Sequence, residues 1–317
     1  LISTYTMNHA TSPLPGTLVC TEAGPSACNS DADAQYAWWW AYYTYWYYSN
    51  LFSRDSIDGV GMRIISTVHF GSGYAMDVVS HELTHGVTNM ESNLFYYYQS
   101  GAINESFSDV FGELTEKYWL GDADWLLGED LSIGAIRDMA NPPAYSDPDK
   151  MTSVYYYTGA GDNGGVHSNS GINNKAAYLM TDGGTFNGYT ITGLGLTKVS
   201  KIYYEANTNL LTSGSDYYDL YLALYQACVN LSLSGAGGIT LADCTQVRNA
   251  TQAVEMHYGQ PYGGFNPNAP ICPTTGQVPS SYIFNDSFEY GMGNFTTEQP
   301  LGANPWYLLT PSIAALA

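Results

Sequence analysis

Residues 81–85 read His-Glu-Leu-Thr-His, in a stretch whose character from Met76 onward is helical. Two histidines four residues apart share one face of a helix, so both imidazoles can bind one metal ion. Zinc suits imidazole nitrogen and tolerates an open coordination position. Glu82 lies beside the first histidine, where it can hold a water molecule activated by the metal and accept its proton. By itself, the pattern is equally compatible with two histidines that pack or face solvent.

A hydrolytic zinc site needs a third protein ligand, which a carboxylate on a neighbouring helix can supply. Residues 104–109 read Asn-Glu-Ser-Phe-Ser-Asp, and Glu105 and Asp109 are again four residues apart. We expect Glu105 to join His81 and His85 as a zinc ligand. Asp109 is then placed to accept a hydrogen bond from a ligating imidazole and orient it.

A third motif lies at residues 162–167, which read Asp-Asn-Gly-Gly-Val-His. Its glycines predict a loop that delivers His167 just before a helix, with Asp162 nearby to hold the ring. A protonated histidine at the mouth of a zinc site can stabilise the oxyanion of a tetrahedral intermediate. The three motifs together make a packing role for the two helix histidines improbable.

With these motifs in this order, the sequence resembles the thermolysin-like family of zinc endopeptidases over roughly residues 3–260. The resemblance rests on residues 81–88 (His-Glu-Leu-Thr-His-Gly-Val-Thr), 100–109 (Ser-Gly-Ala-Ile-Asn-Glu-Ser-Phe-Ser-Asp) and 162–171 (Asp-Asn-Gly-Gly-Val-His-Ser-Asn-Ser-Gly). It implies an α+β fold of two domains, with a reduced β-rich N-terminal part, a mainly helical C-terminal part and the active-site helix between them.

The resemblance also implies a role for each matching position. One catalytic zinc ion would be held by His81, His85 and Glu105, and Glu82 would be the general base. Tyr96 falls where the family has a phenol that contacts the transition state, although Tyr97 and Tyr98 stand beside it. The other implied roles are oxyanion stabilisation for His167, orientation of that ring for Asp162, and support of the ligating imidazoles for Asn104 and Asp109.

A pocket for the residue after the scissile bond is implied by three further positions. Arg137 matches an arginine that contacts the substrate carbonyl, and Ile136 and Val78 match apolar wall positions. The resemblance therefore implies a preference for a hydrophobic residue after the cleaved bond. The alternative for Arg137 is a structural surface residue, and aliphatic residues in such helices most often belong to the core.

Acidic residues near the zinc motifs predict a second cation site, because several hard oxygen ligands suit calcium. Five acids lie there: Asp77, Glu113, Glu116, Asp124 and Glu129. The resemblance to the pseudolysin-like branch implies one calcium ion held by Asp77, Glu113, Glu116, Asp124 and the backbone carbonyl of Leu126. Leu126 stands where the thermolysin branch has an acid of a double site, so we expect one ion, not two. The alternative is a solvated acidic helix face.

Composition excludes several classes of partner. The 317 residues include nine Lys+Arg against 29 Asp+Glu, for a net charge of −20. Nucleic acids and anionic membranes need cationic patches, so neither is expected as a partner. No apolar run reaches the roughly 18 residues of a membrane span. We expect a monomer that acts on protein or peptide substrates.

The five cysteines contain no Cys-x-x-Cys pair. Cys20 and Cys28, and likewise Cys228 and Cys244, are close enough in sequence to close small loops, which leaves Cys272 over. Disulfides in an acidic chain indicate a secreted, extracellular protein. The chain begins Leu-Ile-Ser without Met, which we interpret as a processed chain or a fragment.

Residue patterns divide the chain into four segments: a reduced β-rich domain at 1–75, a helical catalytic domain at 76–259, a linker at 260–282, and the start of a truncated β-domain at 283–317. They predict a strand at 62–70 and helices at 36–53, 102–120, 171–180, 196–208, 217–231 and 241–256.

One departure from the family bears on function. Between Phe70 and Met76 only residues 71–75 stand where the family carries an edge strand that pairs with the substrate backbone. Loss of that strand would weaken substrate positioning, at a cost of about 10²-fold in rate. A non-catalytic zinc- and peptide-binding homologue is therefore the main alternative to an endopeptidase. A calcium-dependent adhesion module that acts through residues 283–317 is the third.

Overall fold

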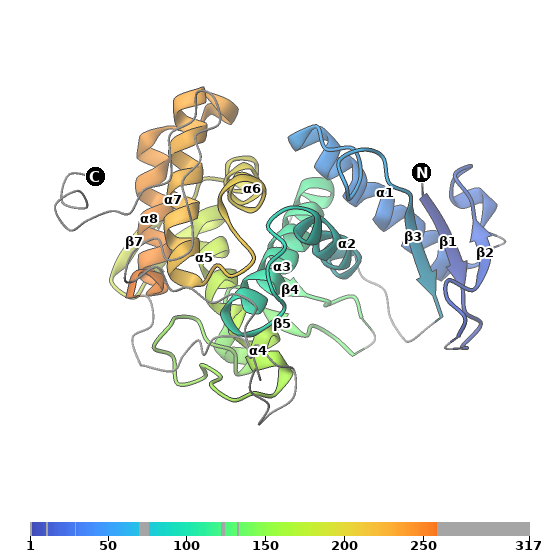
Figure 1. The fold of residues 1–317 in the computed structure, drawn as a ribbon, viewed down its shortest axis with the longest axis horizontal. Coiled ribbons are helices and arrows are strands. Elements are labelled where there is room, and N and C mark those ends of the chain that lie inside the picture. The colour runs from blue at the N-terminus through green and yellow to red at the C-terminus, as the bar shows by residue number, and fades with distance from the viewer. Residues whose placement is uncertain are drawn as a thin grey trace, which may run out of the picture. The chain divides into compact units, whose positions relative to one another are not determined.

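The computed structural model describes residues 2–10, 12–28, 30–69, 76–121, 124–131 and 133–258 (Figure 1). All of these residues lie within one compact unit. The predictions for the linker at 260–282, the β-domain at 283–317 and Cys272 all fall outside the described residues, as do those for residues 70–75.

The N-terminal part is a three-stranded sheet in the order β2-β1-β3, with strands at Ile2–Thr6 (β1), Thr17–Cys20 (β2) and Ile64–Val68 (β3). Strand β1 pairs antiparallel with β2 and parallel with β3. Helix α1 (Ala32–Phe52) lies against β1 and β3 (Figure 1). The apolar residues buried between sheet and helix are Ile2, Ile64, Val68, Ala34, Ala37, Trp38 and Ala41. A disulfide joins Cys20 to Cys28.

Helices α2 (Met76–Met90) and α3 (Tyr98–Leu120) pack against each other and carry the predicted zinc ligands (Figure 1). Helix α3 is buried without interruption from Gln99 to Glu116. Gly112 lets the two helices approach closely, because a Cβ atom there would lie 2.7 Å from the backbone oxygen of Asp77. The two zinc motifs are therefore held against each other by close backbone packing.

The remaining elements follow α3. They are the short pair β4 (Leu126–Leu127) and β5 (Arg137–Asp138), helices α4 (Asp162–Asn169) and α5 (Gly171–Asp182), the hairpin β6 (Gly183–Phe186) and β7 (Tyr189–Thr192), and helices α6 (Leu196–Glu205), α7 (Tyr217–Ser234) and α8 (Leu241–Ala253). Short 3₁₀ turns lie at Pro25–Ala27, Pro142–Tyr145, Ala236–Gly238 and Met256–Tyr258, and a π-helical turn lies at Ala206–Leu210. A second disulfide, Cys228–Cys244, joins α7 to α8.

One large core holds these helices together. Phe107 and Phe111 of α3 pack in it with Tyr47 of α1, Tyr203 of α6 and Leu220 of α7, all at most 1% exposed. None of the described helices is both long and apolar enough to cross a membrane.

The predicted helix boundaries lie within four residues of the observed ones. Helix α1 begins at Ala32, earlier than predicted, because the side chain of Asp31 caps it by accepting a hydrogen bond from the backbone N–H of Ala34 at 3.1 Å. The β6–β7 hairpin was not predicted, although Asn187-Gly188 is a strong hairpin signal. Both residues have positive φ, 46° and 83°, as the tight turn requires.

Candidate metal centre

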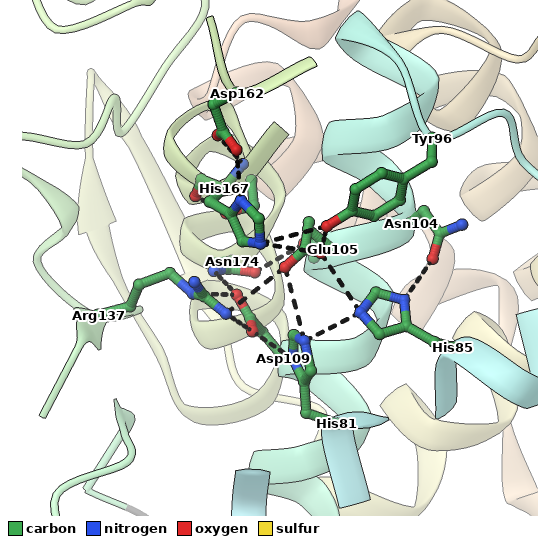
Figure 2. Close-up of polar contacts among 12 residues, drawn as sticks. His81, His85, Tyr96, Asn104, Glu105, Asp109, Arg137, Asp162, His167 and Asn174 are labelled. Atoms are coloured by element: carbon green, nitrogen blue, oxygen red, sulfur yellow. Dashed lines mark hydrogen bonds and ion pairs between the residues drawn. The ribbon is translucent and has the colours of Figure 1, made fainter. Parts of the chain in front are cut away.

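The structure brings the three predicted zinc ligands together (Figure 2). The Nε2 atoms of His81 and His85, one turn apart on α2, are separated by 3.0 Å. The carboxylate of Glu105, on α3, lies 3.5 Å from Nε2 of His81 and 3.3 Å from Nε2 of His85. Glu105 is fully buried and His81 is 5% exposed.

Neighbouring acceptors determine where the protons of the two imidazoles lie. Asn104 donates its amide N–H to the backbone oxygen of Leu94 at 3.1 Å, which turns its carbonyl oxygen toward Nδ1 of His85 at 2.7 Å. Asp109 Oδ1 lies 2.8 Å from Nδ1 of His81. Both acceptors favour the proton on Nδ1 and leave the lone pair on Nε2. Two lone pairs facing each other at 3.0 Å repel, so a cation or a proton must lie between them.

The charge state of Glu105 fits a metal ion as well. Burial alone would raise its pKa, but the proton-bearing forms of His85 and His81, whose place a bound cation would take, outweigh burial and hold the pKa at about 2. Within the described ranges, its buried Oε2 accepts no hydrogen bond. The guanidinium of Arg137 lies 3.6 Å from this oxygen, beyond hydrogen-bond distance, so a cation bound directly to the carboxylate would stabilise it further. Two imidazole nitrogens and one carboxylate are a donor set that suits zinc.

An open cavity of about 320 Å³ lies over this cluster. Glu82 is exposed and lines this cavity together with the three proposed ligands. The cavity is lined by His81, Glu82, His85, Asn89, Tyr96, Asn104, Glu105 and His167. Asn89 had no predicted role, although its spacing of four residues from His85 places it on the same helix face.

His167 reaches the cavity from α4. Asp162 lies 2.7 Å from its Nδ1 and accepts a hydrogen bond from its backbone N–H at 3.0 Å. The turn between them has left-handed backbone at residues 163–165, and a Cβ atom on Gly164 would lie 2.4 Å from the ring of Tyr98. Glycine is therefore required where the loop carrying Asp162 and His167 passes Tyr98.

Of the three adjacent tyrosines, Tyr96 is the one that lines the cavity. Its hydroxyl donates to Glu105 and lies 3.2 Å from Nε2 of His167. Burial and the neighbouring Glu105 carboxylate raise its pKa, so the phenol keeps its proton. Tyr97 and Tyr98 instead pack edge-on against each other.

The three predicted pocket residues, Arg137, Ile136 and Val78, differ from one another in burial. Arg137, in β5, is 8% exposed and binds Asp109 with two hydrogen bonds, from Nε to Oδ2 at 2.8 Å and from Nη2 to Oδ1 at 2.6 Å. Its Nη2 also lies 3.6 Å from Glu105. Ile136 is 38% exposed, and Val78 is half-buried on α2.

A second acidic cluster lies at the other end of the α2–α3 contact. Carboxylate oxygens of Asp77, Glu116 and Glu129 lie within 4.8 Å of one another. Glu113 is fully buried beside them, and in the described part of the chain neither of its oxygens accepts a hydrogen bond. Asp124 is exposed and accepts a hydrogen bond from the backbone N–H of Leu126 at 2.9 Å.

Burial raises the pKa of Asp77, Glu113, Glu116 and Glu129, and repulsion from neighbouring carboxylates raises it further for the three glutamates. The pKa of Asp77 is raised to about 6, that of Glu129 to about 7 and that of Glu116 to about 8, and the pKa of Glu113 is raised well above its ordinary value. The cluster therefore needs protons or a cation, and carboxylate oxygens in this number suit calcium. Glu129 was outside the predicted ligand set but is part of this cluster.

Two family models match the chain. One, described as the thermolysin metallopeptidase catalytic domain, matches residues 2–75, and the other, the alpha-helical domain of thermolysin metallopeptidases, matches residues 92–256. The chain belongs to the thermolysin family of metallopeptidases. The family predicted from the three motifs is thereby confirmed.

Individual members of the thermolysin family are also similar to this chain in sequence. Bacillolysin from Bacillus cereus is 39% identical over an alignment 276 positions long, and the match covers 78% of this chain and 48% of that protein. Thermolysin from Alicyclobacillus acidocaldarius is 39% identical over an alignment 274 positions long, and the match covers 77% of this chain and 49% of that protein. The chain thus spans about half the length of the curated relatives it matches.

A solved structure supports the fold. The precursor of protealysin, a metalloproteinase from Serratia proteamaculans, matches with a TM-score of 0.66 and 27% identity, and the match covers 80% of this chain and 87% of that one. The predicted thermolysin-like α+β fold is confirmed.

Proposed function

We propose that this thermolysin-family chain is an exported zinc endopeptidase that cleaves protein or peptide substrates before a hydrophobic residue. One observation carries the proposal: two imidazole nitrogens that both favour a free lone pair face each other at 3.0 Å beside a fully buried carboxylate. His81, His85 and Glu105 would hold the zinc ion. Zinc bound there would supply a Lewis acid that lowers the pKa of water and polarises a carbonyl group.

The chain's own residues would carry the proton transfers. Glu82 lies in the open cavity, where its carboxylate can accept a proton from the attacking water and pass it to the leaving amine. His167 and Tyr96 face the same space and can donate hydrogen bonds to the carbonyl oxygen as negative charge develops on it. Asp162 fixes the His167 ring with Nε2 toward the cavity.

The remaining site roles are part of the same proposal. Arg137, Ile136 and Val78 would form the pocket for the residue after the cleaved bond, while Asn104 and Asp109 would orient the ligating imidazoles. One structural calcium ion would be held by Asp77, Glu113, Glu116, Asp124 and the backbone carbonyl of Leu126, and the cluster geometry adds Glu129 to these.

The two disulfides support an oxidising, extracellular location. We propose a monomer, and we place the division between the β-rich and helical parts at residues 75 and 76.

A non-catalytic homologue is the second candidate, because only residues 71–75 connect Phe70 to the start of α2 where the family has a substrate-binding strand. Hydrolysis of a denatured protein substrate by zinc-loaded enzyme, repeated after chelation and with Glu82→Gln, separates the two. We expect cleavage that both treatments abolish. A folded protein that binds one zinc ion and cleaves nothing would favour the second candidate.

A further inference from the structure

A chain of buried hydrogen bonds runs from the helical core to Asp109 (Figure 2 shows its last link). Asn174 of α5 donates from Nδ2 to Asp109 Oδ2 at 2.7 Å. Ser106 of α3 lies 2.7 Å from Asn174 Oδ1, and Asn173 donates from Nδ2 to Ser106 Oγ at 2.8 Å. The hydroxyl of Tyr203, on α6, lies 2.9 Å from Asn173 Oδ1. All four donors are at most 1% exposed.

The charge of Asp109 fixes the direction of every link. A carboxylate only accepts, so Asn174 must present its amino group, and its carbonyl oxygen must accept from the hydroxyl of Ser106. The oxygen of Ser106 then accepts from the amino group of Asn173, whose carbonyl accepts from Tyr203. All four donors therefore point toward Asp109, an arrangement in which each hydrogen bond strengthens the next.

Asp109 has about four acceptor positions; three receive hydrogen bonds, and His81 lies within reach of the fourth. Arg137 occupies one on each oxygen, Nδ1 of His81 faces Oδ1 at 2.8 Å, and Asn174 completes Oδ2. The carboxylate thus links a proposed zinc ligand to a proposed substrate-binding arginine. Without the donor from Asn174, the guanidinium of Arg137 would be the main remaining restraint, and Asp109 could turn away from His81.

We propose that Tyr203, Asn173, Ser106 and Asn174, here called the donor relay, are positioning residues that hold Asp109 and, through it, His81 and Arg137. The inference rests on the proposed function, because the roles of His81 and Arg137 do. None of the hydrogen bonds that define the relay is made to a proposed zinc ligand or to Arg137. The relay can therefore act on them only through Asp109.

Helix α3 offers a matched control. Ser106 and Ser108 are both fully buried, two residues apart on the same helix. Ser106 joins two links of the relay, whereas the hydroxyl of Ser108 has no hydrogen-bond partner among the residues that the structure describes. Replacing either with alanine removes one buried oxygen, so a difference between the two variants reports the relay rather than the loss of a hydroxyl.

The experiment compares the full chain with Asn174→Leu, Ser106→Ala, Tyr203→Phe and Ser108→Ala. Competition with a chromophoric chelator measures the zinc Kd, and hydrolysis of a peptide substrate gives kcat and KM. Thermal unfolding of the zinc-free protein gives the Tm. We expect the zinc Kd to rise by about 10- to 100-fold in Asn174→Leu and about 10-fold in Ser106→Ala, the range for residues that support metal ligands. Tyr203→Phe should show a smaller change, and Ser108→Ala should stay within about twofold of the wild type.

The outcomes separate this inference from the proposed function. If the wild-type chain binds zinc, and Ser106→Ala and Tyr203→Phe leave the zinc Kd and kcat/KM unchanged, the proposed relay is wrong but the proposed function stands. Equal losses in Ser106→Ala and Ser108→Ala would lead to the same conclusion. A wild-type chain that neither binds zinc nor cleaves peptides refutes the proposed function, and the relay with it. If Asn174→Leu does not fold, the two single-oxygen variants still decide, and the zinc Kd decides even for a chain without activity.

Discussion

Nε2 of His81 lies 3.0 Å from Nε2 of His85, while Nδ1 of each ring faces an oxygen acceptor at 2.8 and 2.7 Å respectively. The acceptors at Nδ1 explain why the two Nε2 atoms can face each other. Each acceptor draws the ring proton away from the shared side, so the lone pairs converge instead of pairing with donors. This pair of rings is arranged for a cation, and the acceptors that support it are as testable as the ligands.

Asn104→Leu should raise the zinc Kd by about 10- to 100-fold, because it removes the carbonyl that holds the proton on Nδ1 of His85. Chelator competition measures the effect. Asn89→Leu is the control, since Asn89 lines the same cavity from one helical turn further along. If both variants bind zinc as the wild type does, the orienting role of Asn104 is wrong.

His167→Ala should lower kcat by about 10²- to 10³-fold with a smaller effect on KM, as expected for loss of one oxyanion donor. The zinc content should stay near one equivalent, because His167 is not among the three proposed ligands. Steady-state kinetics with metal analysis provides both readouts. His257→Ala is the control, because His257 packs against Tyr221 and Tyr258. A loss confined to KM would contradict the oxyanion role.

Short-range patterns predicted the parts of the site that lie within single segments. His81 and His85 are four residues apart on one helix, as are Glu105 and Asp109, and the helix period alone makes each pair share a face. Asp162 and His167 meet across one glycine turn. In these cases local geometry determines the contact, so the sequence was sufficient.

The contacts of the donor relay could not be predicted from the sequence, for a physical reason. Ser106, Asn174 and Tyr203 come from three helices, and only tertiary packing brings them together. A buried Ser or Asn carries no local signature of its partner, because the same residues also occur at caps and turns. The β6–β7 hairpin was a different case, since Asn187-Gly188 carried a local signal that was not used.

Calcium should stabilise the protein more at pH 8 than at pH 5. Buried carboxylates with raised pKa hold more protons in the folded than in the unfolded state, so the free energy of unfolding of the metal-free protein falls as pH rises. For Glu116 this window runs from its ordinary value of 4.5 to about 8. Calcium replaces those protons, so its effect on Tm is small where protons already neutralise the cluster. Thermal unfolding of dialysed protein, with and without calcium, measures both trends.

Glu113→Gln should separate the two effects at this cluster. At pH 8 the metal-free variant should have a higher Tm than the metal-free wild type, because the buried Glu113 must either bind a proton or remain an unpaired charge, and glutamine needs neither. With calcium present the order should reverse, because one ligand is gone as well. Glu22→Gln is the control: its partner is Arg63 on the surface. Parallel shifts of the variant with and without calcium would argue against a cation site here.

Gly164→Ala should lower kcat as His167→Ala does, although it changes no proposed catalytic group. An alanine at φ 91° is strained, and its Cβ would lie 2.4 Å from the Tyr98 ring, so the loop that carries Asp162 and His167 must move. Gly121→Ala isolates the backbone cost: Gly121 has φ 85° and nothing within 4 Å of the added Cβ.

Both glycine variants should lose about 1 kcal/mol or more of stability from the left-handed backbone, but only Gly164→Ala should lose activity. Adding Tyr98→Ala to Gly164→Ala removes the ring in the way and should restore much of kcat without restoring the backbone cost. Recovery of kcat in the double variant, with Tm still low, would show that the fit of Gly164 against Tyr98 positions His167. Equal activity losses in the two single variants would show instead that a general loss of stability is responsible.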